Sequence, residues 1–154
     1  MLNRDFDCLT VNGICDLSEK NIIAGSPLTL GANGYKLCGA SDKFVGLSFN
    51  YYHIGKNDVT GGEWFADSGK VGVVKIAQCT LEADEIDGVK VAPFVLPTSE
   101  SASESAFNYI PGALLAVNAD GKLEVTADAS KAVATVVAFD AQKGALTVFV
   151  NAKN

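Results

Sequence analysis

Reactive side chains are few in this sequence, and their spacing restricts the chemistry they could perform. The only histidine is His53, and a histidine base activates a nucleophile only when the two are held side by side. No G-x-S-x-G elbow, P-loop, dinucleotide-binding G-x-G-x-x-G or H-E-x-x-H motif occurs in the chain. We therefore interpret His53 as hydrogen-bonded scaffolding, and we expect no enzymatic activity, no catalytic residues and no cofactor.

The four cysteines do not follow the spacing of a metal site. None belongs to a C-x-x-C pair, and a single histidine leaves zinc without a regular ligand set. No apolar run follows Arg4, as a secretory signal would require, so we expect a reducing compartment in which disulfides are rare. We predict no metal, and small buried hydrophobic roles for Cys8, Cys15, Cys38 and Cys79.

Charge restricts the partners that the chain can bind. The net charge is −6, Arg4 is the only arginine, and the lysines are scattered. Nucleic-acid binding requires a clustered basic face that replaces counterions, so we expect none. No uninterrupted apolar stretch is long enough to span a bilayer, and we expect no membrane partner. The acidic residues concentrate in the 82–87 segment, which we interpret as a solvated loop.

Aromatic residues gather in a short window between residues 51 and 65. Aromatic side chains are enriched at binding hot spots, so the window could form a partner surface. It could equally be a folded-over hairpin whose rings complete the core. The candidate partner-binding residues here are Tyr51, Tyr52, Trp64 and Phe65.

The elements that would position these residues are β-strands. At 154 residues, 48% hydrophobic and 19% charged, the chain is a single domain and is not disordered. Short β-type runs alternate with turn residues every 8–12 residues, which is typical of a barrel or sandwich. We predict strands at 8–14, 27–30, 35–38, 43–52, 63–66, 71–79, 89–96, 113–117, 122–126, 131–139 and 145–150. The predicted fold class is all-β, a small antiparallel β-barrel or β-tulip-like body of hairpins.

The domain boundaries follow from changes in composition. Residues 1–20 are polar and terminal, and we predict an extended or poorly ordered N-terminal arm. Residues 21–154 form one β domain, with β segments at 21–96 and 109–154 joined by a serine-rich loop at 97–108.

The two β segments resemble each other. Gly25 matches Gly112 and Gly34 matches Gly121, in both cases 87 residues apart. Each segment reads as a strand, an N-G or D-G turn, a return strand, a long apolar strand and a closing strand. This predicts an internal repeat, with residues 51–70 as an insertion that only the first copy carries.

Two predicted strands are apolar on both sides. Residues 71–79 and 132–139 lack the alternation expected of a sheet with one wet face. The second face must be covered by another sheet of the domain or by a neighbouring subunit. We expect closed self-association, with Val74 and Val136 as candidate contact residues.

The segment 112–150 resembles the closing half of the head decoration, or capsid cement, proteins of tailed bacteriophages. The similar features are a G-x-x-L stretch, a D-G-K-hydrophobic turn, a valine/alanine strand ending in an acidic residue, and a glycine before a V-x-V strand. They lie at Gly112–Leu115, Asp120–Leu123, Val133–Asp140 and Gly144–Val150. Residues 24–76 are also compatible, so the resemblance covers about two thirds of the chain.

The resemblance implies a structural virion protein, made in the host cytoplasm, that binds the outside of the assembled head and stabilises it. It implies a major capsid protein as partner, oligomers at capsid symmetry axes, and an N-terminal segment along the shell, with Arg4 and Phe6 as candidate contacts. Because this family often occupies threefold sites of the capsid lattice, the oligomer that the resemblance implies is a homotrimer. The acidic 82–87 segment, the aromatic insertion and the serine-rich loop depart from the family pattern.

Other functions compete with this interpretation. A phage tail or baseplate β-domain would share the same texture. A carbohydrate- or cell-surface-binding module would use the aromatic 51–65 window. A small hydrolase is the remaining alternative.

Overall fold

The computed structural model describes residues 3–4, 9–16, 19, 21–49, 52–56, 63–65, 70–86, 88–96 and 109–152. These residues form strands and turns without any helix, so the predicted all-β class is confirmed. The strands are β1 Asn3–Arg4, β2 Leu9–Ile14, β3 Asn21–Ile22, β4 Pro27–Gly31, β5 Gly34–Leu37, β6 Gly46–Ser48, β7 Tyr52–Lys56, β8 Glu63–Phe65, β9 Lys70–Glu82, β10 Asp84–Ile86, β11 Val89–Val91, β12 Leu114–Val117, β13 Leu123–Val125, β14 Ala134–Asp140 and β15 Ala145–Asn151.

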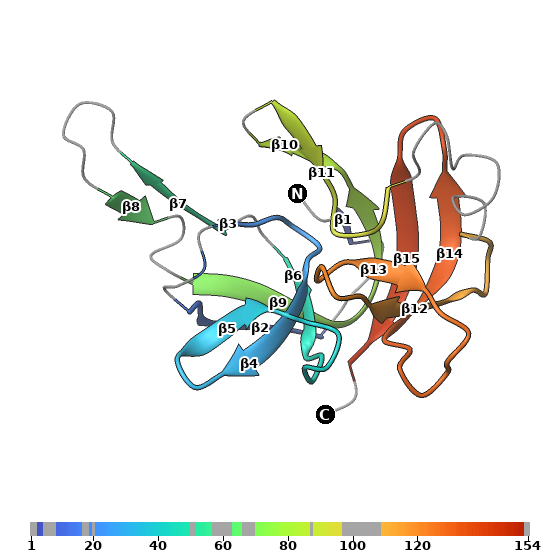
Figure 1. The fold of residues 1–154 in the computed structure, drawn as a ribbon, viewed down its shortest axis with the longest axis horizontal. Coiled ribbons are helices and arrows are strands. Elements are labelled where there is room, and N and C mark those ends of the chain that lie inside the picture. Colours follow the sequence, from blue (N-terminus) through green and yellow to red (C-terminus); the bar gives the residue numbers. More distant parts are fainter. Residues whose placement is uncertain are drawn as a thin grey trace.

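Two units with the same strand pairings make up the body (Figure 1). In the first unit, residues 9–75, β2 pairs with β9, β9 with β6, β6 with β4, and β4 with β5. In the second unit, residues 76–152, β9 pairs with β15, β15 with β14, β14 with β12, and β12 with β13. A parallel bridge follows the first strand of each unit, at Cys15↔Tyr35 and at Phe94↔Leu123. The predicted internal repeat is therefore present in the fold.

Backbone hydrogen bonds repeat as well. Gly25 N donates to Ser48 O at 2.7 Å, and Gly112 N donates to Val136 O at 2.8 Å. Both glycines have positive φ, 88° and 90°, a conformation that favours glycine. Further matched bonds are Ser26 N–Ile23 O with Ala113 N–Ile110 O, Val45 N–Leu28 O with Val133 N–Leu115 O, and Cys38 N–Pro27 O with Thr126 N–Leu114 O.

Strand β9 belongs to both units and explains the strand with two apolar faces. Its first half pairs with β2 and its second half with β15, and the β2 register shifts between Leu9 and Thr10, opposite Lys75. Because a bulge moves the following side chains to the other face, Val71 and Val73 enter one core. Beyond the shift, Ala77 and the alternate residues after it enter another. Both faces are thus covered within one chain.

The two cores differ in size. The first contains Cys15, Ile22, Leu28, Val71 and Val73. The second contains most buried residues of the second unit and takes Cys38, Phe44, Leu47 and Val74 from the first. The second core is therefore built from side chains of both units. Cys15, Cys38 and Cys79 are all buried, as predicted, and Cys8 lies outside the described residues.

The structure revises the predicted N-terminal arm. Leu9–Ile14 runs along β9, Asp16 N donates to Tyr35 O at 2.8 Å, and Cys15 is completely buried. Residues 3–4 pair with Thr80 and Cys79. Residues 9–16 are therefore part of the first unit, because β9 offers them a full edge of backbone partners that sequence polarity does not reveal.

Two hairpins extend beyond the repeated pairings. One is β7–β8, which also contacts β3 and lies in the predicted insertion at 51–70. The other is β10–β11, a two-stranded sheet by itself within the region described. Both project toward the upper side of the view in Figure 1. The acidic 82–87 segment, predicted as a loop, is mostly strand, although Glu82, Asp84 and Glu85 are solvent-exposed as expected.

Candidate interaction surface

The aromatic candidates lie on the β7–β8 hairpin. Tyr52 pairs with Ile22 of β3, Trp64 with Gly55, and Phe65 with Ile54. The hairpin thus brings three of the four aromatic candidates onto one small sheet that is not among the strand pairings repeated in the two units. Tyr51 and Phe6 lie outside the described residues. Arg4 is at the far end of β9, where its backbone pairs with Cys79.

Val74 and Val136 lie inside the protein. Val74 is 0% exposed and Val136 is 2% exposed, and both belong to the second core. Neither side chain reaches the surface of the monomer, so neither can contact a separate partner unless the fold opens. The two-sided pattern that suggested a subunit contact arises because β9 passes between two cores, and because alternate residues of β14 are only half-buried.

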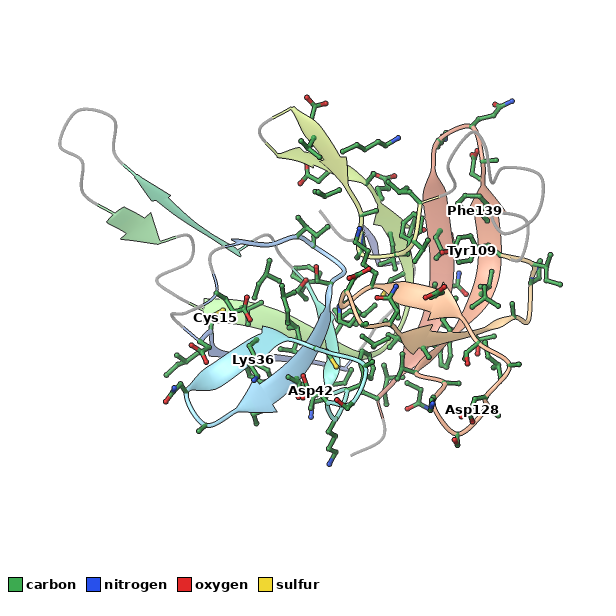
Figure 2. All side chains as sticks on the ribbon, in the orientation of Figure 1. Cys15, Lys36, Asp42, Tyr109, Asp128 and Phe139 are labelled. Carbon is green, nitrogen blue, oxygen red and sulfur yellow. The ribbon has the colours of Figure 1, made fainter. Side chains whose placement is uncertain are left out.

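An aromatic cluster closes the second unit above β14 (Figure 2). Tyr109 lies edge-on to Phe94 at 5.9 Å between ring centroids and tilted against Phe139 at 5.2 Å. The Tyr109 hydroxyl donates to Val95 O at 2.7 Å. Burial, helped by the charge of Glu124, raises the pKa of Tyr109, so the hydroxyl remains a donor. The bond joins the two ends of the serine-rich segment, which itself lies outside the described residues.

A cavity of about 370 Å³ lies where the two units meet. Equivalent loops of the two units, which connect β5 to β6 and β13 to β14, supply Asp42, Phe44, Ser130 and Lys131 to its lining. Asp42 Oδ2 accepts a bond from Gly39 N at 2.9 Å and is therefore used in the turn. Burial and then the Asp42 charge raise the pKa of Cys38 to about 11, which keeps this thiol neutral and weakly nucleophilic.

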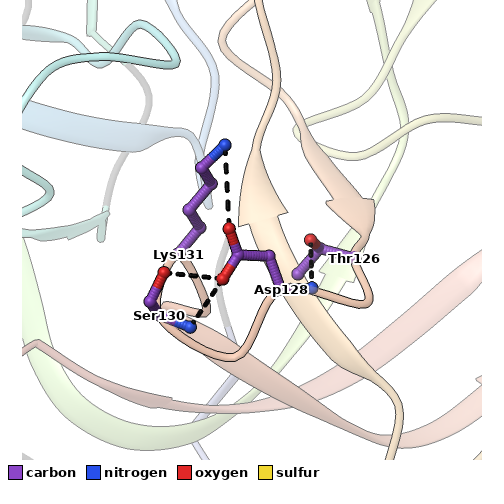
Figure 3. Close-up of polar contacts among 4 residues, drawn as sticks. All are labelled: Thr126, Asp128, Ser130 and Lys131. Atoms are coloured by element: carbon purple, nitrogen blue, oxygen red, sulfur yellow. Dashed lines mark hydrogen bonds and ion pairs between the residues drawn. The ribbon is translucent and has the colours of Figure 1, made fainter.

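The loop before β14 is held by its own polar side chains (Figure 3). Asp128 accepts bonds from the hydroxyl and the backbone N of Ser130, at 2.6 and 3.0 Å, and its own N donates to Thr126 Oγ1 at 3.1 Å. Lys131 Nζ lies 3.8 Å from Asp128 Oδ2. The Ser130 bonds are the main cause of the lowered pKa of Asp128. These contacts shape a turn whose residues 127–131 are exposed.

Ser48 carries the main buried polar contact of the first unit. Its hydroxyl donates to Ile23 O at 2.7 Å and accepts from Ser26 N at 3.0 Å. The matching position in the second unit is Val136, so this bridge belongs to the first unit alone. Sequence reasoning did not single out Ser48, Tyr109 or the β10–β11 hairpin. Ser48 and Tyr109 stand out only through hydrogen bonds to residues distant in the sequence. The β10–β11 hairpin stands out only because the first unit has no counterpart to it.

Among the residues that the structure describes, no three His, Cys, Asp or Glu side chains come together in a group that could hold a metal ion. No helix of that part of the chain could cross a bilayer. No known family, curated protein or solved structure matches this chain.

Proposed function

We propose that this chain is a structural protein of a tailed-phage virion, which binds the outer surface of the assembled head and stabilises it. The observation that carries the proposal is where the family-like motifs fall. The G-x-x-L stretch begins β12, the Asp120-Gly121 turn leads to β13, the valine/alanine segment is β14, and Gly144 precedes β15. The resemblance therefore coincides with four neighbouring strands of the second unit, in the order β13-β12-β14-β15, and is not scattered over unrelated surfaces.

The duplicated body suits this role. Two β units in one chain give a broad surface for contact, and many copies on a lattice act together even when each contact is weak. The partner would be the major capsid protein. The proposed function requires no catalytic group, metal or cofactor, and its mechanism is burial of interface area.

Self-association as a homotrimer remains part of the proposal. It is supported only by the resemblance to proteins that occupy threefold capsid sites. The apolar-face argument no longer favours it, because both faces of the first half of β9 are covered inside one chain.

The test uses heads of the encoding phage assembled without this protein. Purified protein should bind expanded, empty heads and raise the temperature at which they break open. High copy number in purified virions would distinguish a head protein from a tail or baseplate domain. Failure to bind expanded heads would refute the proposed role. Glycan binding by the purified protein would favour a carbohydrate-binding module instead.

A further inference from the structure

The β10–β11 hairpin of the second unit has no counterpart in the first unit. In the first unit, β2 ends at Ile14 and the next residue, Cys15, bridges to β5. In the second unit, the matching passage from the end of β9 to Phe94 is interrupted by the β10–β11 hairpin. Because the first unit makes the same pairings without a hairpin, β10–β11 is an addition to the shared framework.

The hairpin has two chemically different faces. Its pairs are Asp84↔Val91, Glu85↔Lys90 and Ile86↔Val89. Since side chains alternate along a strand, Val89, Val91 and the Asp84 opposite Val91 share one face, while Glu85 and Lys90 share the other. Glu85 and Lys90 are of opposite charge and directly opposite each other, which supports the ribbon.

The apolar face, which carries Val89 and Val91, is open to solvent at Val89, and Glu85 and Lys90 on the opposite face are exposed as well. Val89 is 61% exposed, among the most exposed large hydrophobic side chains in the part of the protein that the structure describes. Lys90 Nζ lies 3.9 Å from the place that a Cβ on Gly144 would occupy. The polar face therefore leans toward the β14–β15 turn, and Val89 points away from it. An isolated two-stranded ribbon is marginally stable in water, so its open apolar face is a feature to be explained.

Charge decides between the possible occupants of this face. Glu82, Asp84 and Glu85 are exposed around it, against one lysine, Lys90, and the whole chain carries −6. A second copy of the chain, a nucleic acid and an anionic membrane would all bring like charge to the ribbon. A protein surface with an apolar seat bordered by lysine or arginine complements it.

We propose that the β10–β11 hairpin is a docking arm, which places Val89 in an apolar seat on a partner protein and its carboxylates against basic side chains around that seat. This inference rests on the proposed function for the identity of the partner, the head shell. It adds which element makes the contact and what chemistry the shell must present.

The test compares Val89→Thr with Ile110→Thr in binding to heads assembled without this protein. Val89 and Ile110 are 61% and 60% exposed, and threonine preserves β preference at both positions. Val89→Thr should bind about tenfold more weakly, because its hydroxyl would be desolvated in the seat without a partner. Ile110→Thr should bind as the parent does, and both variants should keep the parent melting temperature.

A charge pair completes the experiment. Asp84→Lys, on the Val89 face of the hairpin, should weaken binding and flatten its dependence on salt, whereas Glu124→Lys, exposed but outside the hairpin, should not. If the parent binds heads and Val89→Thr binds equally well, the docking arm is wrong and the proposed function stands. If the parent does not bind heads, both fail. If Val89→Thr instead dissociates a parent oligomer in light scattering, the occupant is a second copy and the inference is overturned.

Discussion

Gly46 is the residue at which a single methyl group should reveal how closely β6 approaches β9. Its φ is +150°, and a Cβ at this position would lie 2.5 Å from Val74 O and 2.7 Å from Val73 Cγ1. The first of these neighbours is backbone, which cannot rotate away. Gly46→Ala must therefore either strain its own backbone or move β9, whose Val74 pairs with Leu47.

The magnitude follows from two contributions. A non-glycine residue in a rarely populated backbone region costs about 1–3 kcal/mol. Weakening one backbone hydrogen bond between β6 and β9 adds about 1 kcal/mol. We expect the free energy of unfolding to fall by about 3 kcal/mol, which at roughly 2–4 °C per kcal/mol lowers the melting temperature by about 6–12 °C.

Thermal unfolding followed by circular dichroism measures this change, and Gly88→Ala is the matched control. Gly88 has φ +77° but no atom within 4 Å of its would-be Cβ, so only the backbone contribution applies. The second unit shows that a unit of this kind tolerates a methyl at the matching position. There, Ala134 pairs with Leu115 as Gly46 pairs with Leu28. A Gly46→Ala shift no larger than that of Gly88→Ala would refute the reasoning.

Three further outcomes are expected. Val74→Asp and Val136→Asp should each abolish cooperative unfolding, because both sites are buried in the second core and a lone carboxylate there has no partner; a folded variant by near-ultraviolet dichroism would contradict the burial. Tyr109→Phe should lose about 1 kcal/mol with the bond to Val95 O. Because the folded-state pKa of Tyr109 is raised, its contribution is complete below the ordinary tyrosine pKa and is lost as pH rises above it; the phenylalanine variant should show a smaller alkaline loss of stability in urea titrations between pH 8 and 11. Cys38, whose pKa is raised to about 11, should resist iodoacetamide at pH 8 in the folded protein and react once it is unfolded; equal rates in both states would contradict its burial.

The sequence predicted the framework best where local chemistry decides it. Positive φ is required at Gly25 and Gly112 and in the Asn33-Gly34 and Asp120-Gly121 turns. Because these glycines recur 87 residues apart, the sequence predicted the repeat. The predicted strand at 43–52 was less accurate: of its described residues, 43–49 and 52, only β6 at Gly46–Ser48 and the first residue of β7 are strand. Strand ends depend on partners that local sequence does not contain.

The candidate site was predictable only in part. The aromatic window and the acidic segment were visible as composition, and each contains an added hairpin. The prediction that Val74 and Val136 contact another subunit was wrong, because both side chains are buried inside the monomer. A strand with two covered faces has the same sequence pattern whether another subunit or the same chain covers it.

By itself, the sequence determined the all-β class, the hairpin turns and the duplication, because glycine conformation and β preference act within a few residues of the chain. Only the tertiary structure decided that β9 serves both units, that the register shift opposite Lys75 turns its side chains from one core to the other, and that residues 9–16 complete the first unit. These features join Leu9–Ile14 to Lys70–Ile76, and Ala145–Asn151 to Ile76–Glu82. The physical reason is that strands so far apart in the sequence pair wherever a strand edge still lacks backbone hydrogen-bond partners and a core still lacks apolar side chains. Local sequence does not contain that information.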